Sequence, residues 1–340
     1  MRLALAALLA AVAPAPTLAA PTPAGEDDHA GWIQDFDAAV DVAKREKKDL
    51  FVDFTGSDWC SWCIRLNKEV FVHDEFLEPI RKKYVLVMLD YPQKPEALAR
   101  VPNRERNQEV AQRYQIDGYP TVVLMTAEGE EYGRMGYQPG GPLAYVEAIE
   151  ELWPRRDTLR EILKRVAEFE AAKGEEARDL ALDRAITQLA AMDHDAPAIE
   201  RLASVARAAF DVDQSGGKGL KQRAIRALVT SRQADYEVVQ QALPLDPRNA
   251  DGFREKTILA WCGAVTSKAD LAPVTEAIAE VDGFGIKDPK VAVELYVNAA
   301  FWYQRFLADG EQAKAYARKA RAIGTDVEEY EAMLAQILGE

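Results

Sequence analysis

Two cysteines that are separated by two residues offer the clearest chemistry in the chain. Cys60 and Cys63 follow a predicted strand at 50–54 and open a predicted helix at about 60–71. At a helix N-terminus, free N–H groups and the macrodipole stabilise an anion, so we expect Cys60 to have a lowered thiol pKa and to be the nucleophile. Cys63 lies one turn later on the inward face. We expect it to attack a mixed disulfide formed on Cys60.

Asp53 interrupts the apolar strand that leads to this turn, and side-chain alternation places it on the same face as Phe51. A carboxyl group that is buried there has a raised pKa and is suited to accept the proton of Cys63 during resolution. The alternative is an edge-strand carboxylate that faces water.

Three aromatic residues and a proline accompany the cysteine pair. We expect Trp59 and Trp62 to shape a docking surface for substrate, although both have the alternative of packing in the core. Tyr119 precedes Pro120. Pro120 is the first residue of a predicted strand, a position that suits proline because its backbone nitrogen cannot donate to a β-ladder. We expect Tyr119 to line the groove in which this docking surface receives the substrate. The alternative is that Tyr119 packs as an ordinary loop residue.

The run Asp58-Trp59-Cys60-Ser61-Trp62-Cys63, with the strand before it, resembles the active-site stretch of the thioredoxin superfamily. More narrowly, it is similar to thioredoxin-like proteins of bacterial cell envelopes that carry a Gly-Ser-Asp-Trp-Cys-x-Trp-Cys turn. Gly118-Tyr119-Pro120-Thr121 is the second family mark, and the resemblance covers about 30–153. It implies a thioredoxin fold, a cis Pro120 whose neighbouring backbone pairs with an extended substrate, and the role of buried acid for Asp53.

The elements that must position these residues form an α/β domain over 32–153, with a central mixed sheet flanked by helices. Glu128-Gly129 marks the turn of a hairpin, and Pro142 starts the closing helix. The predicted elements are a helix whose apolar face runs from Trp32 to Ala43, the strand 50–54, the helix 60–71, a buried strand at 84–89, a helix at 105–114, the hairpin 122–125 and 131–137, and a helix at 142–153.

Residues 155–340 show almost no strand signal and predict an all-α domain of helical hairpins. A repeat of 33 residues aligns Asp213 with Asp246 and Gly219 with Gly252. A period near 34 residues is typical of tetratricopeptide-like arrays, and a non-repeating helical bundle is the alternative. Either architecture would position partner proteins rather than perform chemistry.

The first 20 residues have the features of a secretory signal peptide, with a basic start, an apolar run at 3–13 and small residues for cleavage. A polar linker at 21–31 follows. We expect a periplasmic or secreted protein of the bacterial cell envelope with no membrane insertion after cleavage, the alternative being an uncleaved anchor. The net charge of −14 argues against nucleic acid and against anionic membrane surfaces as partners.

Other residues that could bind a metal ion or act as a further reactive thiol give weaker indications of function. The stretch 211–222 opens like a calcium loop, but Gln222 stands where a bidentate Glu is needed. Cys262 lies in an apolar helical stretch, which indicates core packing. The histidines are scattered, so we predict no metal site, and copper bound by the two thiolates is an open alternative. The three histidines are His29, His73 and His194.

These observations predict an exported thiol–disulfide oxidoreductase that acts on protein disulfides. Cys60 attacks, Cys63 resolves the mixed disulfide and Asp53 moves the proton. No cofactor is implied, because the electrons reside on the dithiol. The expected partners are proteins with disulfides or thiols, and the resemblance suggests a membrane-embedded thiol reductase as electron donor. A non-enzymatic scaffold that docks partners is the alternative, and the direction of electron flow stays open.

Overall fold

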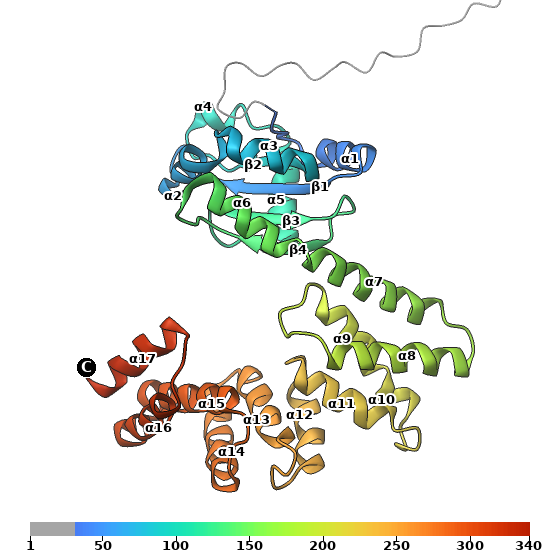
Figure 1. Ribbon diagram of the computed structural model, residues 1–340, viewed down its shortest axis with the longest axis vertical. Coiled ribbons are helices and arrows are strands. Elements are labelled where there is room, and N and C mark those ends of the chain that lie inside the picture. The colour runs from blue at the N-terminus through green and yellow to red at the C-terminus, as the bar shows by residue number, and fades with distance from the viewer. Residues whose placement is uncertain (1–30) are drawn as a thin grey trace, which may run out of the picture. The chain divides into compact units, whose positions relative to one another are not determined.

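The computed structural model describes residues 31–340, and Figure 1 shows their arrangement. The predicted signal peptide at 1–20 lies outside the described residues, as does the predicted linker except for Gly31. Within the described chain, the predicted α/β fold followed by an all-α region is confirmed.

A four-stranded sheet in the order β2-β1-β3-β4 carries the first part of the chain. β1 lies between two neighbours in the sheet and is buried at every residue. It pairs in parallel with β2, with Asp53 opposite Met88. Gly129 has a φ of +81° in the predicted turn between β3 and β4. The strands are β1 (Asp49–Thr55), β2 (Tyr84–Asp90), β3 (Thr121–Met125) and β4 (Glu131–Met135).

Seven helical segments accompany this sheet. The predicted helix at 60–71 is an α-helix that continues as a π-helix, and the first predicted helix begins later than expected. Asp35 accepts the N–H of Ala38 at 2.9 Å and so starts the helix after itself, while Ile33 bridges to Val87 of β2. The segments are α1 (Phe36–Glu46), α2 (Ser61–Leu66), η1 (Asn67–Phe71), α3 (Asp74–Lys83), α4 (Pro95–Leu98), α5 (Arg104–Arg113) and α6 (Gly141–Leu152).

Aromatic packing anchors helices on the face of β1 that also carries Asp53. The ring of Phe51 lies 5.7 Å from Phe71 and 5.5 Å from Phe76, in edge-to-face contacts. Tyr145 of α6 packs on the same two phenylalanines at 5.8 and 6.2 Å. Because Phe51 and Asp53 alternate to one side of the strand, this cluster covers the carboxyl group as well.

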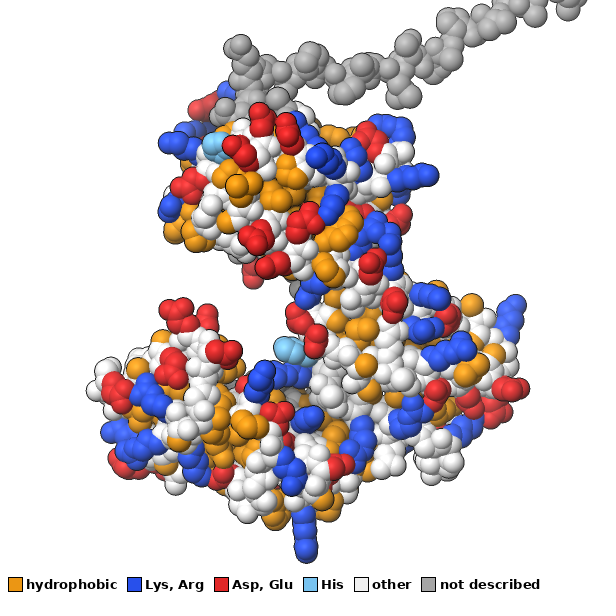
Figure 2. Space-filling view, viewed as in Figure 1, with side chains coloured by type: hydrophobic (Ala, Val, Ile, Leu, Met, Phe, Trp, Pro, Cys, Tyr) orange, Lys and Arg blue, Asp and Glu red, His pale blue; other side chains and the backbone are white. Residues whose placement is uncertain are grey.

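The remaining chain consists of helices, coloured from green to red in Figure 1. Lys and Arg side chains are interspersed with Asp and Glu on the face that Figure 2 shows. The α-helices are α7 (Arg155–Ala171), α8 (Glu175–Ala190), α9 (Ile199–Arg207), α10 (Ala209–Val212), α11 (Leu220–Thr230), α12 (Tyr236–Ala242), α13 (Phe253–Gly263), α14 (Leu271–Phe284), α15 (Pro289–Trp302), α16 (Gly310–Ile323) and α17 (Glu328–Leu338). Shorter segments are η2 (Leu243–Leu245), η3 (Lys268–Asp270) and η4 (Tyr303–Leu307).

Contacts divide the chain into two compact units. Of the described residues, one unit contains 31–122 together with Gly136–Val146, and the other contains Val123–Met135 with Glu147–Glu340. In the second unit, the β3–β4 hairpin is held to the helices by arginines. Arg155 Nε donates to the carbonyl of Tyr132 at 3.0 Å, and Arg201 makes two bonds to Glu130 at 3.1 and 2.8 Å. The predicted domain limits at 153 and 155 stay a prediction.

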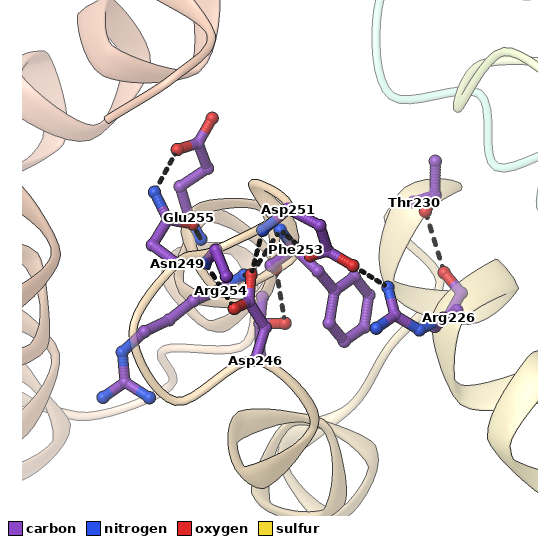
Figure 3. Close-up of polar contacts among 10 residues, drawn as sticks. Arg226, Thr230, Asp246, Asn249, Asp251, Phe253, Arg254 and Glu255 are labelled. Atoms are coloured by element: carbon purple, nitrogen blue, oxygen red, sulfur yellow. Dashed lines mark hydrogen bonds and ion pairs between the residues drawn. The ribbon is translucent and has the colours of Figure 1, made fainter. Parts of the chain in front are cut away.

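The aligned residues of the 33-residue repeat perform the same structural task in two turns. Gly219 and Gly252 have φ values of +72° and +79° and immediately precede α11 and α13. Asp213 accepts the N–H of Lys218 at 3.0 Å, and Asp246 accepts that of Phe253 at 3.0 Å, as Figure 3 shows for the second turn. Asp213 is therefore a turn-capping residue, as its alignment with Asp246 indicates.

A buried carboxylate links successive turns of the helical region. Glu255 is fully buried, and it accepts bonds from the Asn249 side chain at 2.6 Å and from the N–H groups of Lys287 and Asp288 at 2.8 Å each. Figure 3 shows the bond to Asn249. These bonds join the start of α13 to the start of α15.

Replacing Glu255 with alanine should therefore leave several buried donors without an acceptor. We expect a loss of about 3 kcal/mol in the free energy of unfolding. This loss is measured by chemical denaturation, with the circular dichroism signal of the helices as the readout. Glu276→Ala, at an exposed position of α14, is the matched control. Equal stability of the two variants would contradict this account.

Candidate functional site

Cys60 and Cys63 are joined by a disulfide, with their Cα atoms 5.3 Å apart. Cys60 is the N-cap of α2, and its Sγ accepts the N–H of Cys63 at 3.2 Å. Both residues are largely buried, with exposed fractions of 6% and 3%. The structure thus places the sulfur of Cys60 at a helix N-terminus, where an N–H and the helix dipole would favour its thiolate.

The turn before Cys60 is tied to the end of β2 and to the segment that follows it. Ser57 donates to the carboxylate of Asp90 from its backbone N–H at 2.8 Å and from its hydroxyl at 2.5 Å. In return, Asp58 accepts the N–H groups of Gln93 at 2.9 Å and Lys94 at 2.7 Å. These bonds, and that from Gln93 most of all, hold the pKa of Asp58 below its usual range. No sequence signal marked this contact, because the partners lie more than thirty residues apart.

Trp59 and Tyr119 come together beside the cysteine pair. Trp59 is 43% exposed, its Nε1 donates to the carbonyl of Tyr91 at 2.9 Å, and its ring meets that of Tyr119 edge-on at 5.7 Å. A Cβ atom at Gly56 would lie 2.6 Å from the indole, so the ring occupies space that only glycine leaves. The Tyr119–Pro120 peptide bond is cis. Core packing of Trp59, the alternative at this position, is wrong.

Trp62 is 51% exposed and belongs to a separate cluster. Its ring lies 4.9 Å from that of Tyr137, and the Arg65 guanidinium lies 5.1 Å from the Tyr137 ring. Glu69 accepts bonds at 2.8 Å from both Arg65 Nε and the Tyr137 hydroxyl. The spacing of Arg65 and Glu69 in a helix was a usable signal for their ion pair, whereas nothing local points to Tyr137.

Asp53 is buried, with an exposed fraction of 4%, and one of its oxygens has no hydrogen-bond partner. Burial and, second, the charge of Asp90 raise the pKa of Asp53 to about 8, against the lowering effect of the Thr55 hydroxyl. Its charge also helps to raise the pKa of Tyr145, for which burial is the larger cause. The alternative of a water-facing carboxylate is therefore wrong.

The remaining thiol lies outside this site. Cys262 is buried in α13, and burial raises its pKa to about 12, which confirms the interpretation of a core residue. Among residues 31–340, no three His, Cys, Asp or Glu side chains gather in a way that would hold a metal ion. No helix in the described part of the chain is both long and apolar enough to cross a membrane.

Comparisons with known proteins point to the same region. A family model described as a thioredoxin-like domain matches residues 36–147. The disulfide bond reductase DsbH of Chlamydia pneumoniae is 37% identical over 114 residues, which are 33% of this chain and 66% of DsbH. The thioredoxin-related protein DsbJ of the same organism is 30% identical over 111 residues, which are 33% of this chain and 31% of DsbJ.

A solved structure described as DsbH oxidoreductase is 31% identical, covers 41% of this chain and 94% of its own, and superposes with a TM-score of 0.33. The stretch of this chain that matches the two relatives from Chlamydia pneumoniae spans just under two thirds of DsbH and about a third of DsbJ. The family match includes the strand, the turn and the helix that carry the cysteine pair. This chain thus contains a thioredoxin-like domain, which spans residues 36–147 and precedes a helical region.

Proposed function

We propose that this protein is an exported thiol–disulfide oxidoreductase that reduces protein disulfides. The observation that carries the proposal is the position of Cys60 at the start of α2, where its sulfur accepts the N–H of Cys63. A thiolate at that position is stabilised and available as a nucleophile. The similarity to a protein named a disulfide bond reductase favours reduction over oxidation.

The proposed reaction proceeds through a mixed disulfide. The Cys60 thiolate attacks one sulfur of the substrate disulfide, so that a Cys60–substrate bond forms and the other substrate sulfur leaves as a thiolate. Cys63 then loses its proton and attacks the Cys60 sulfur. The Cys60–Cys63 disulfide forms, the second substrate thiol leaves, and two electrons have passed to the substrate.

Asp53 is the proposed acceptor of the proton from Cys63. Its carboxyl is buried and one of its oxygens lacks a partner, so a proton can be taken up without breaking a bond at that oxygen. With a pKa of about 8, the group carries its proton in most molecules at neutral pH. The fraction of molecules in which Asp53 is ready to accept a proton should therefore increase as the pH rises toward 8.

Two exposed tryptophans and two half-buried tyrosines supply the proposed surface for the substrate. Trp59 and Tyr119 line one side, and the backbone beside Pro120 is the proposed pairing partner of an extended substrate segment. Trp62, with Tyr137, provides a second apolar contact. The helical region is the proposed docking element for partner proteins, and a membrane-embedded thiol reductase is the proposed donor that regenerates the dithiol.

The equilibrium reduction potential of the Cys60–Cys63 couple tests this function. We expect the mature protein, titrated against a dithiothreitol buffer, to show a two-electron couple with a reduction potential of about −250 mV, in the range of reductants. A potential near about −120 mV would instead indicate an oxidant that introduces disulfides. Absence of a reversible couple would favour a scaffold that docks partners without redox chemistry.

A further inference from the structure

Two carboxylates brace the cysteine turn against the end of β2 and the segment that follows it, and each accepts two bonds from the other side. Asp58 accepts the N–H groups of Gln93 and Lys94 at 2.9 and 2.7 Å. Asp90 accepts the backbone N–H and the hydroxyl of Ser57 at 2.8 and 2.5 Å. We call these five residues the cross-brace. All four of its bonds end on a carboxylate, which makes them shorter and stronger than bonds between neutral groups.

The segment held by the cross-brace contributes directly to the surface beside Cys60. The N–H of Tyr91 donates to the carbonyl of Thr55 at 2.9 Å, and the carbonyl of Tyr91 accepts the Trp59 indole. The Tyr91 ring lies 5.4 Å from that of Tyr119. Tyr91 therefore contacts both Trp59 and Tyr119.

Tyr91 is also fixed at its far end. Its hydroxyl donates to the carbonyl of Asn107 at 2.7 Å, and its ring stacks on Phe54 of β1 at 6.4 Å. The cross-brace connects the rest of the segment, at Gln93 and Lys94, to the turn that carries Cys60. Its release would free Gln93 and Lys94 and, through the neighbouring chain, loosen the carbonyl that orients Trp59.

We propose that Asp58 and Asp90 are positioning residues that hold the aromatic wall of the substrate groove. They act on the binding of an extended protein substrate more than on sulfur chemistry, since their bonds end on the neighbouring segment and on Ser57 rather than on either sulfur. This inference rests on the proposed function, because it assigns the groove to a protein disulfide.

Single-turnover reduction of two disulfides by the reduced, full-length protein tests the proposal. Insulin needs the groove, whereas the small aromatic disulfide DTNB requires access to Cys60 alone. For Asp58→Ala we expect the half-saturating insulin concentration to rise about tenfold. The ratio of the insulin rate constant to the DTNB rate constant should fall by about the same factor.

Two further substitutions separate charge from geometry. Asp58→Asn keeps one acceptor oxygen and loses the charge, so we expect a smaller rise in the half-saturating insulin concentration. Asp41→Ala removes an exposed aspartate of α1 and serves as the control for loss of charge. Ser57→Ala deletes only the hydroxyl bond of the cross-brace and gives a second, milder variant should Asp58→Ala fail to fold.

Hydrogen exchange reports on the cross-brace itself. The amides of Gln93 and Lys94 should exchange at least about tenfold faster in Asp58→Ala, because their acceptor is gone. Unchanged exchange, an unchanged half-saturating insulin concentration, or an equal fall in the insulin and DTNB rates would each overturn the proposal. Failure of the wild-type protein to reduce either disulfide would instead refute the proposed function.

Discussion

Cys63→Ser should turn the protein into a trap that accumulates mixed disulfides with its substrates through Cys60. The serine hydroxyl cannot displace a thiolate, so the reaction stops after the first exchange step. Turnover with insulin should fall on the order of a thousandfold or more, since a member of a catalytic unit is lost. Non-reducing electrophoresis and mass spectrometry of the adduct measure the trapped species.

Three variants make this experiment decisive. Cys60→Ser should form no adduct, because the remaining thiol, Cys63, lies inside α2 and lacks the N-cap position that favours a thiolate. Cys262→Ser should behave as wild type, since its thiol is buried in α13 and burial raises its pKa to about 12. An adduct that forms through Cys63 alone would reverse the assigned roles, and capture of the same partners by the variant lacking both site cysteines would support the scaffold.

Asp53→Asn should remove a large pH dependence of stability. The folded protein keeps the Asp53 proton up to a pKa of about 8, whereas the unfolded chain releases it near 3.8. Between these pH values the folded state binds more protons, so the free energy of unfolding falls as pH rises, and it levels off above 8. The asparagine side chain has no such proton. The variant should therefore gain on the order of 5 kcal/mol relative to wild type between pH 4 and 8.

Urea denaturation of the oxidised proteins at several pH values measures this difference, and subtraction of the two curves cancels the carboxylates that they share. In Asp53→Asn, the release of substrate from the mixed disulfide should be about a hundredfold slower. That step should also lose its increase with pH toward 8. Parallel stability curves for the two proteins would show that Asp53 does not carry the proposed proton.

Local patterns were sufficient for the elements around the cysteine pair. The apolar strand, the turn and the following helix are read from adjacent residues, so the position of Cys60 at a helix N-terminus could be predicted. The helix that the sequence predicts at 105–114 agrees with α5 to within one residue at each end. The first helix begins later than its apolar spacing predicts, because Trp32 continues that spacing although Asp35 caps the helix.

Contacts between distant residues were beyond such patterns. The cross-brace joins residues that are 33 to 36 positions apart, and Tyr137 meets Glu69 across 68 positions. No periodicity marks these pairs, because each depends on how segments that are remote in the chain pack together. Asp90 ends β2, and the sequence carries no signal that Asp58 accepts bonds from the segment that follows this strand.

By itself, the sequence determined the chemistry of the dithiol, the α/β and all-α halves of the chain, and the candidate acid at Asp53. These features follow from residue type, side-chain alternation and helical spacing, which act over a few positions. Only the tertiary structure decided that Asp53 is buried with an unpartnered oxygen and that Trp59 is exposed. It also decided which loop supports Cys60. Burial and hydrogen-bond partners depend on the packing of segments that are remote in the chain, and that packing sets a carboxyl pKa and shapes a groove.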